Sequence, residues 1–226
     1  MSVNRLLGKK REMSQIFKDD GELIPVTILE VGPCTVAQVK NEETDGYNAV
    51  QLGFGDIKLN RVSKPVKGHW KSAGAEPRRT IRESRLTEPT ELKPGDVVKV
   101  ADVFKEGDFI DVIGKTKGRG FQGGIRRHGF NSGPRAHGTK NTREMGSIGS
   151  ATTMARVQKG TRMPGHMGTN QVTVRNLLVA RIDSERNLLY VRGAVPGFNG
   201  AEILVRKAKA KRAKKEDRAL RKGKGQ

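Results

Sequence analysis

Apolar and β-branched residues occur along this chain mainly in short runs separated by Gly, Pro and Asp. Residues 24–40, IPVTILEVGPCTVAQVK, predict two strands broken at Gly32-Pro33, and residues 45–55, DGYNAVQLGFG, predict a strand entered through a turn. Residues 93–104 and 105–118 each begin with a tight turn and continue as a strand. Short strands at this close spacing are typical of a β-barrel or a β-sandwich.

The strand pattern returns near the end of the chain. Residues 171–197, QVTVRNLLVARIDSERNLLYVRGAVPG, predict two strands joined at Asp183–Asn187, and residues 201–207 predict a further one. We therefore expect a mainly β body made of residues 1–114 and 171–205. The N-terminal residues 5–11 are expected to form a basic arm.

Residues 56–95 are a less regular part of this body. Their prolines and glycines leave room only for a short helix near Gly68–Ala73, and the alternation of TIRESRL at 80–86 is compatible with a strand. Trp70, the single tryptophan, either packs against the body or stacks on a base. We expect it to pack.

Between the two sets of strands lies a segment with no apolar run longer than two residues. Residues 115–170 hold eleven Lys and Arg, one acid (Glu144) and frequent glycines. A segment of this composition buries too little apolar surface to fold alone, and a loop this long in a domain is functional or disordered. We call residues 115–170 the basic insertion.

The charge is concentrated in two places. The formal net charge is +20 and the sequence pI about 10.4, which predicts a polyanionic partner. The basic insertion and a tail of residues 206–226, with eleven Lys and Arg against Glu216 and Asp217, hold nearly all of the excess. We expect the tail to be disordered until it meets a polyanion, although it would also serve simply to keep the chain in solution.

Motifs for catalysis, cofactors and metals are weak or absent. Residues 118–123, GRGFQG, match the spacing of a dinucleotide-binding loop, but the glycine-rich sequence that follows argues against a helix and no acid occurs before Glu144. His128, His137 and His166 lack the spacing of zinc ligands, and no hydrolase or P-loop signature occurs. We predict no enzyme activity, no cofactor, no metal and no small-molecule substrate.

Cys34, the only cysteine, lies in an apolar run and is interpreted as a small buried residue rather than a reactive thiol. It allows no intramolecular disulfide. No signal peptide and no apolar stretch near the ~18 residues of a membrane span are evident, so we expect a reducing, soluble compartment and no membrane partner.

The basic insertion has the chemistry that RNA packing requires. Glycine lets the backbone approach phosphates closely, and arginine supplies planar bidentate donors. Phe121 and Phe130 either stack on unpaired bases or fold back to fix the base of the loop; both readings stay open. The predicted RNA-binding residues are Lys115, Lys117, Arg119, Phe121, Gln122, Arg126, Arg127, His128, Arg135, His137, Lys140, Arg143, Arg156, Lys159, Arg162 and His166.

Four stretches together resemble large-subunit ribosomal protein three in its bacterial or organellar form. They are LLGKKREMSQIF near the start, KTKGRGFQGGIRRHGF with the following GPRAHG, GSIGSATTMARVQKGTRMPGHMG, and VTVRNLLVARIDSERNLLYVRGAVPG. The resemblance runs from the first residues to about Ala208. It implies a translation-protein-type β-barrel and a cytoplasmic or organellar ribosome as the location. The alternative from another class is an RNA-modifying enzyme with a β-barrel fold.

The resemblance also implies partners and a site. The family binds 23S rRNA near its 3′ end, acts early in 50S assembly, neighbours large-subunit proteins fourteen and nineteen, and extends a loop toward the peptidyl transferase centre. The implied tip of that loop is Gly149, Ser150, Ala151, Thr152, Thr153 and Met154.

The sequence departs from the family pattern at two positions and in the length of its tail. Glu12 replaces the family's usual glycine, which puts a local turn in question. Thr152 stands where many bacterial members carry a glutamine that is methylated in some, so no glutamine methylation is expected there. The tail after Ala208 is longer than is usual.

Overall fold

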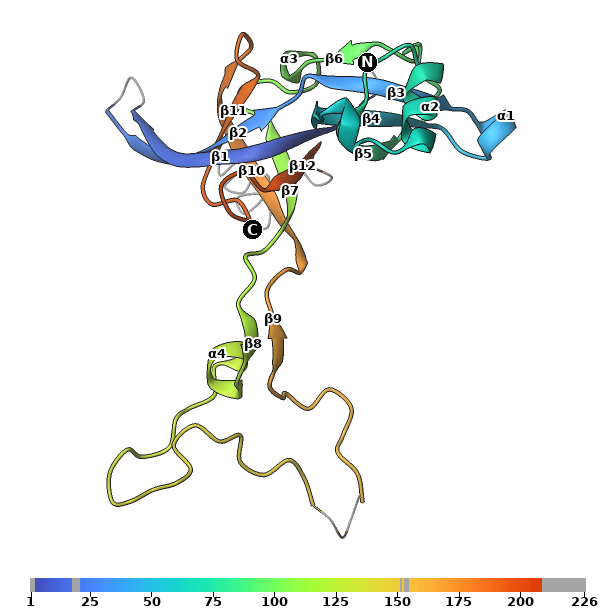
Figure 1. The fold of residues 1–226 in the computed structure, drawn as a ribbon. Coiled ribbons are helices and arrows are strands. Elements are labelled where there is room, and N and C mark those ends of the chain that lie inside the picture. The colour runs from blue at the N-terminus through green and yellow to red at the C-terminus, as the bar shows by residue number, and fades with distance from the viewer. Residues whose placement is uncertain (1–2, 18–20, 151, 153–154, 209–226) are drawn as a thin grey trace, which may run out of the picture. The chain divides into compact units, whose positions relative to one another are not determined.

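A computed structural model describes residues 3–17, 21–150, 152 and 155–208. It divides into two compact units: residues 1–115 with 171–226, which we call the body, and residues 116–170. The predicted tail lies outside the described residues except for Arg206, Lys207 and Ala208. Figure 1 shows the elements of both units.

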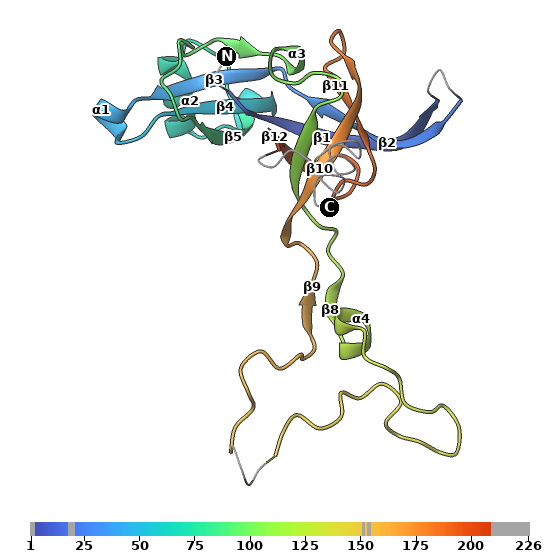
Figure 2. The same cartoon turned by 180° about the vertical axis from the view of Figure 1, so that it is seen from behind.

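The centre of the body is a closed six-stranded barrel, which confirms the expected mainly β class. All its pairings are antiparallel, and the strands follow one another in the order β1 (Arg5–Phe17), β12 (Glu202–Lys207), β7 (Phe109–Lys115), β10 (Gln171–Asp183), β11 (Leu188–Arg192) and β2 (Leu23–Val31). Since β7 pairs with both β10 and β12, the chain before residue 116 is hydrogen-bonded to the chain after residue 170. Figure 2 shows the same strands from behind.

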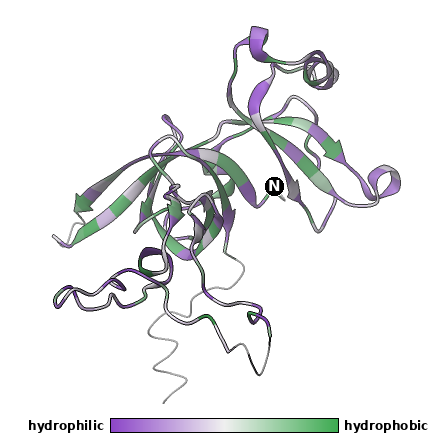
Figure 3. Cartoon of the chain, turned by 60° about the horizontal axis from the view of Figure 1, so that its bottom comes forward, coloured by the Kyte–Doolittle hydropathy of each residue, from purple (hydrophilic) through white to green (hydrophobic). Residues whose placement is uncertain are grey.

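Alternation of side chains fills the barrel. In β2 and β12 every second residue near the centre is buried, including Leu29, Val31, Ile203 and Val205. Burial of such side chains stabilises the fold by about 1.5–3 kcal/mol each. Figure 3 shows hydrophobic positions concentrated along the strands of the body and sparse along the loops of the basic insertion.

A second, four-stranded sheet completes the body. Its order is β5 (Arg78–Arg85), β4 (Ala49–Asp56), β3 (Cys34–Lys40) and β6 (Val97–Val98), and the connecting helices are α1 (Glu42–Asp45), η1 (Leu59–Arg61), α2 (Lys64–Ser72) and α3 (Val100–Val103). Trp70 of α2 is 0% exposed, and its ring lies where a Cβ on Gly53 of β4 would be. The tryptophan therefore packs against the body, as expected, and fixes α2 on the sheet.

Several local expectations were wrong. The predicted basic arm is β1, and its Lys10 is buried with its ammonium donating to the carbonyl oxygens of Val195 (2.8 Å) and Gly197 (3.3 Å). The strand expected within residues 93–104 is only β6, because the chain then turns into α3. A five-residue helix, α4 (Gly124–His128), occurs where the glycine-rich sequence seemed to forbid one.

Glu12, which replaces the family's usual glycine, does not prevent β1 from forming. The register between β1 and β2 shifts between Lys10 and Met13, so that two residues of β1 oppose one of β2, as in a β-bulge. Glu12 is exposed within this bulge, and it does not adopt positive φ.

The predicted start of the tail, at residue 206, lies inside a strand. Arg206 and Lys207 belong to β12, and the Arg206 guanidinium contacts the Asp111 carboxylate at 3.0 and 3.1 Å. Within the described residues no helix has the length and apolar character needed to cross a membrane.

Candidate nucleic-acid interface

The two ends of the basic insertion run antiparallel. Strand β8 (Gly120–Gln122) pairs with β9 (Gly165–Met167), and Figures 1 and 2 both show these strands side by side. The ladder continues through the Arg119 amide, which donates to the Met167 carbonyl at 2.9 Å, and the Thr116 amide, which donates to the Asn170 carbonyl at 2.9 Å. Backbone hydrogen bonds therefore hold this part of the insertion without an apolar core.

Glycine permits the close approach of the two chains. Gly168 adopts φ of +88°, and a side chain there would meet the backbone of residues 117–119. At Gly165 a Cβ would lie 2.5 Å from Nη1 of Arg127. These glycines serve the insertion's own packing.

Two of the predicted RNA-binding residues, Arg127 and His128, contact the same carbonyl oxygen of their own chain. The Arg127 guanidinium donates to the Met163 carbonyl oxygen at 2.6 Å, and His128 Nε2 lies 3.0 Å from the same oxygen. Both side chains are only half-exposed. These contacts hold α4 to the chain that precedes β9. This structural role was not predicted, because only the charge of Arg127 and His128 was considered.

The two phenylalanines behave differently. Phe130 folds back, since its ring fills the position of a Cβ on Gly124 and lies 5.9 Å, centroid to centroid, from the His128 ring. Phe121 is 76% exposed and sits opposite His166 in the β8–β9 ladder. Directly opposite residues of an antiparallel pair lie on the same face, so an exposed phenyl ring and an exposed imidazole are neighbours there.

The remaining predicted cations face solvent. Ten are exposed, and none forms an ion pair with a residue that the structure describes. They are Lys115, Lys117, Arg119, Arg126, Arg135, Lys140, Arg143, Arg156, Lys159 and Arg162. Unpaired basic side chains on a loop with a single acid produce a positive field that attracts polyanions.

The other predicted site residues are varied. Gln122 donates to the Arg119 carbonyl, and His166 Nε2 lies 2.9 Å from Thr169 Oγ1. His137 is exposed at φ of 58°. Of the implied tip, Gly149, Ser150 and Thr152 are exposed, while Ala151, Thr153 and Met154 lie outside the described residues.

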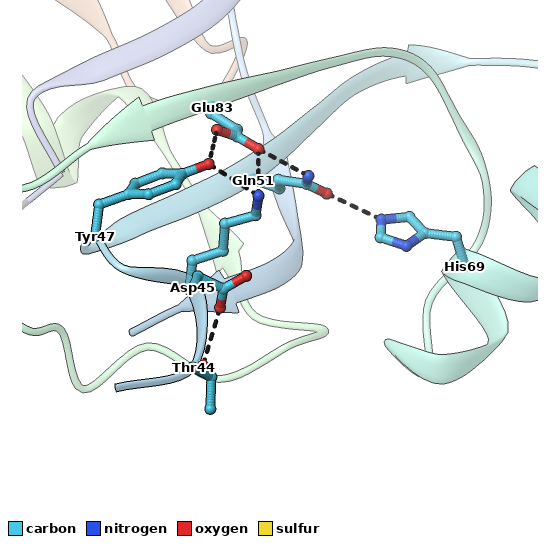
Figure 4. Close-up of polar contacts among 7 residues, drawn as sticks. Thr44, Asp45, Tyr47, Gln51, His69 and Glu83 are labelled. Carbon is cyan, nitrogen blue, oxygen red and sulfur yellow. Dashed lines mark hydrogen bonds and ion pairs between the residues drawn. The ribbon is translucent and has the colours of Figure 1, made fainter. Parts of the chain in front are cut away.

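Among the described residues of the body, a cluster of ionisable side chains on the four-stranded sheet and α2 is a candidate catalytic site. Tyr47 Oη accepts a hydrogen bond from Lys40 (2.9 Å) and donates one to Glu83 (3.0 Å), while Gln51 Nε2 donates to Glu83 at 3.1 Å and Gln51 Oε1 lies 2.9 Å from His69 Nε2. Figure 4 shows Tyr47, Gln51, His69 and Glu83 arranged around these contacts.

The contacts of Glu83 and Lys40 in this cluster favour their charged forms. The hydrogen bond from Gln51, followed by that from Lys40, lowers the pKa of Glu83. The hydrogen bonds to Tyr47 and Glu83 raise the pKa of Lys40. A general base works best with a pKa near the operating pH, and these two shifts move both groups away from neutrality. The described residues also contain no group of three or more His, Cys, Asp or Glu suited to a metal.

Cys34 behaves as a structural residue. It is buried, its thiol donates to the Leu7 carbonyl oxygen at 3.6 Å, and burial raises its pKa to about 12. A thiol in this state is inert.

The β-barrel body and the glycine-rich loop of unpaired cations together indicate a polyanion-binding protein. Comparisons with known proteins agree. The family model described as "Ribosomal protein L3" matches residues 87–188. Large ribosomal subunit protein uL3 of Pelotomaculum thermopropionicum is 52% identical over 203 residues, which cover 90% of this chain and 96% of the relative. The uL3 proteins of Corynebacterium jeikeium and Thermotoga petrophila are 47% and 49% identical, each over 92% of this chain and over 95% and 99% of their own lengths.

The chain therefore belongs to the uL3 family of large-subunit ribosomal proteins. It is a structural constituent of the large ribosomal subunit and not an enzyme. The resemblance seen in the four sequence stretches is thereby confirmed, and the RNA-modifying alternative is set aside.

One cationic surface was missed. Residues 57–75 of the body contain five Lys and Arg and no acid, although residues 1–114 and 171–205 together carry 22 Lys and Arg against 21 Asp and Glu. The available signal was the local charge count, which averaging over the whole body concealed.

Proposed function

We propose that this chain is a primary rRNA-binding protein that binds 23S rRNA near its 3′ end, nucleates 50S assembly, and carries the basic insertion through RNA toward the peptidyl transferase centre. In this proposal residues 1–114 and 171–205 form the body, residues 115–170 enter the RNA, and the basic tail predicted for residues 206–226 follows β12, which includes Arg206 and Lys207. Large-subunit proteins fourteen and nineteen are its proposed neighbours.

The observation that supports this proposal most strongly is the set of ten exposed cations of the basic insertion that are unpaired within the described residues. Each phosphate that such a side chain neutralises releases counterions and adds to affinity at low salt. Arg127 and His128 take a supporting part, because their contacts with Met163 hold α4, which carries Arg126, to the chain that precedes β9.

Phe121 gives the insertion a way to recognise unpaired RNA. An exposed ring on a two-stranded ribbon offers a flat face to a base, and stacking on such a ring is worth about 1–3 kcal/mol per base. His166, across the ladder from Phe121, offers a second ring or a hydrogen bond to the same nucleotide.

Binding of the full chain to fragments of large-subunit rRNA, with excess unrelated RNA as competitor and across a range of KCl, tests the proposal. We expect one fragment, containing the 3′ region, to stay bound when the others are displaced. Equal binding to every fragment, abolished together by salt, would refute specific recognition.

Shortening the tip, residues 149–156, tests the reach of the insertion. The body should unfold at the same urea concentration as in the unaltered chain, because the described residues of the tip, Gly149, Ser150, Thr152, Ala155 and Arg156, are all exposed. Late subunit maturation or tRNA accommodation should be impaired. Normal subunit profiles and normal translation rates in this variant would contradict the proposed approach to the catalytic centre.

A further inference from the structure

The cations of residues 57–75 form a surface that the function above does not use. Lys58 precedes η1, Arg61 ends η1, and Lys64, Lys67 and Lys71 lie on α2. All five are exposed, and none forms an ion pair with a described residue. The nearest acids in sequence, Asp56 and Glu76, lie outside the segment on either side.

The spacing of the α2 lysines places them in one stripe. Residues three and four apart lie on the same face of a helix, so Lys64, Lys67 and Lys71 follow one another at about 4.5 Å and 6 Å along the axis. Gly68 lies between them, and a Cβ there would meet no atom within 4 Å. The stripe is therefore open to a partner.

The opposite side of α2 is fixed to the sheet. Trp70 packs over Gly53 of β4, and His69 Nε2 lies 2.9 Å from Gln51 Oε1 on the same strand. Gln51 in turn donates to Glu83 of β5 at 3.1 Å, and Figure 4 shows this series from His69 to Glu83. The helix thus displays its lysines from a rigid support, which lowers the entropy lost on binding.

The chemistry of the surface favours phosphate over bases. Its aromatic groups are unavailable, since Trp70 is buried and the His69 ring is engaged with Gln51. Lysine acts as a point charge, without the planar fork with which arginine reads an edge. Two apolar side chains, Leu59 and Val66, are exposed nearby, too few to form the apolar centre of a protein interface.

We propose that residues 57–75 are a second RNA-binding surface, on the body rather than on the basic insertion, which contacts the phosphate backbone of paired RNA without reading its sequence. The inference rests on the proposed role in rRNA binding for its partner, but it uses none of the residues assigned there.

A pair of triple variants tests the surface by binding. Lys64→Ala/Lys67→Ala/Lys71→Ala removes the stripe. Lys93→Ala/Lys99→Ala/Lys105→Ala is the matched control, because these three lysines are also exposed but each is followed three positions later by an aspartate that accepts a hydrogen bond from its backbone amide. Each variant loses the same three charges from the formal +20.

The measurement is the dissociation constant of each full-length variant for a fully paired RNA duplex across a range of KCl. We expect the α2 variant to bind roughly 10- to 100-fold more weakly at low salt, with a slope of log affinity against log salt smaller by about 2–3, near 0.9 per lost phosphate contact as in duplex DNA. The control should change less than about threefold. Equal losses in the two variants would overturn the proposal.

A tethered probe locates the contact independently. Gly68→Cys places a thiol in the stripe, and the only native cysteine, Cys34, is buried with its pKa raised to about 12, so a maleimide-linked iron chelate attaches at position 68 alone. Val97→Cys, at a position 53% exposed on β6, is the control. With large-subunit rRNA bound, radicals from position 68 should cut a paired region of the backbone more strongly than those from position 97.

The outcomes separate this inference from the proposed function. If the α2 variant still selects the 3′ fragment but matches its control on duplex RNA, and position 68 cuts no more than position 97, the second surface is refuted and the insertion's role stands. If neither the unaltered chain nor the variants select a fragment, the proposed function fails. Loss of binding to an acidic ribosomal protein, with RNA binding unchanged, would also overturn the inference.

Discussion

Two basic side chains of the barrel are bound to atoms of their own chain, whereas most of those of the basic insertion face solvent. In the barrel, Lys10 donates to two carbonyl oxygens and Arg206 contacts the buried Asp111 carboxylate. In the insertion only Arg127 among the eleven cations is half-buried and bound to its own chain. The same side-chain chemistry therefore stabilises the fold at these two positions of the barrel and remains available for a partner in the insertion, as it does at the exposed cations of residues 57–75.

The sources of order differ in the same way. Every buried hydrophobic side chain among the described residues belongs to the body, while the one buried residue described in unit 116–170 is Gly124. Apolar burial is the main favourable term in folding. The insertion instead relies on a short backbone ladder and a few side-chain contacts. Stability and RNA affinity should therefore respond to different mutations.

Asp111→Ala should give the largest effect, on the body alone. It leaves the Arg206 guanidinium, 18% exposed, without its carboxylate and removes the acceptor for the Asn176 amide. Breaking a buried ion pair in this way costs about 3–5 kcal/mol, which urea unfolding measures. Asp56→Ala is the control, because its carboxylate pairs with Arg78 but is 91% exposed; it should cost less than about 1 kcal/mol. Similar losses in both variants would show that the barrel does not depend on this buried pair.

Phe121→Ala should affect RNA binding alone. Loss of one stacked base weakens binding to unpaired RNA by about 1–3 kcal/mol, roughly 5- to 150-fold, and fluorescence anisotropy measures it. The unfolding midpoint should stay constant, since the ring is exposed. Phe198→Ala, which removes an exposed phenyl ring from a loop of the body, is expected to leave RNA affinity unaltered. A drop in stability without a drop in affinity would assign Phe121 to the fold.

Glu83→Gln should give the smallest effect, a loss of stability at neutral pH that disappears in acid. Because the folded state lowers the pKa of Glu83, its carboxylate contributes stability above the unfolded pKa of about 4.3 and loses it as pH falls through the folded value. The unaltered chain should therefore lose more stability between about pH 5 and pH 3 than the variant, by about 0.5 kcal/mol. Glu76→Gln, on an exposed residue without an ion pair among the described residues, is the control. If the free energy of unfolding fell equally with pH in the unaltered chain and in Glu83→Gln, the lowered pKa of Glu83 would be contradicted.

The sequence was a good guide where one face of a strand is buried. Residues 24–40 and 171–192 show β-branched patterning, and they form β2 and β3 and β10 and β11 as predicted. Residues 5–17 gave no such signal, because β1 carries a bulge and buries a lysine whose carbonyl partners lie about 185 residues away in the chain. No local pattern contains that information.

The site was predictable in composition but not in detail. Charge and glycine content identified residues 115–170, and exposure supports ten of the eleven predicted cations as candidates. The supporting roles of Arg127, His128 and Phe130 depend on contacts with Met163 and Gly124 that exist only once the loop has folded back. Helix α4 was missed for the same reason, since tertiary contacts override weak local propensity.

Closure of the barrel has a consequence for how the chain is made. The outer edge of β1, at Arg5–Lys9, pairs with β12, which follows it much later in the chain, at Glu202–Lys207. At about 5–20 residues per second, the interval between the two strands is roughly 10–40 s. During that time the newly made chain has an open strand edge, which is a template for wrong pairing, and the basic insertion has already emerged. The nascent protein must therefore be protected from both aggregation and premature RNA binding until β12 has been made.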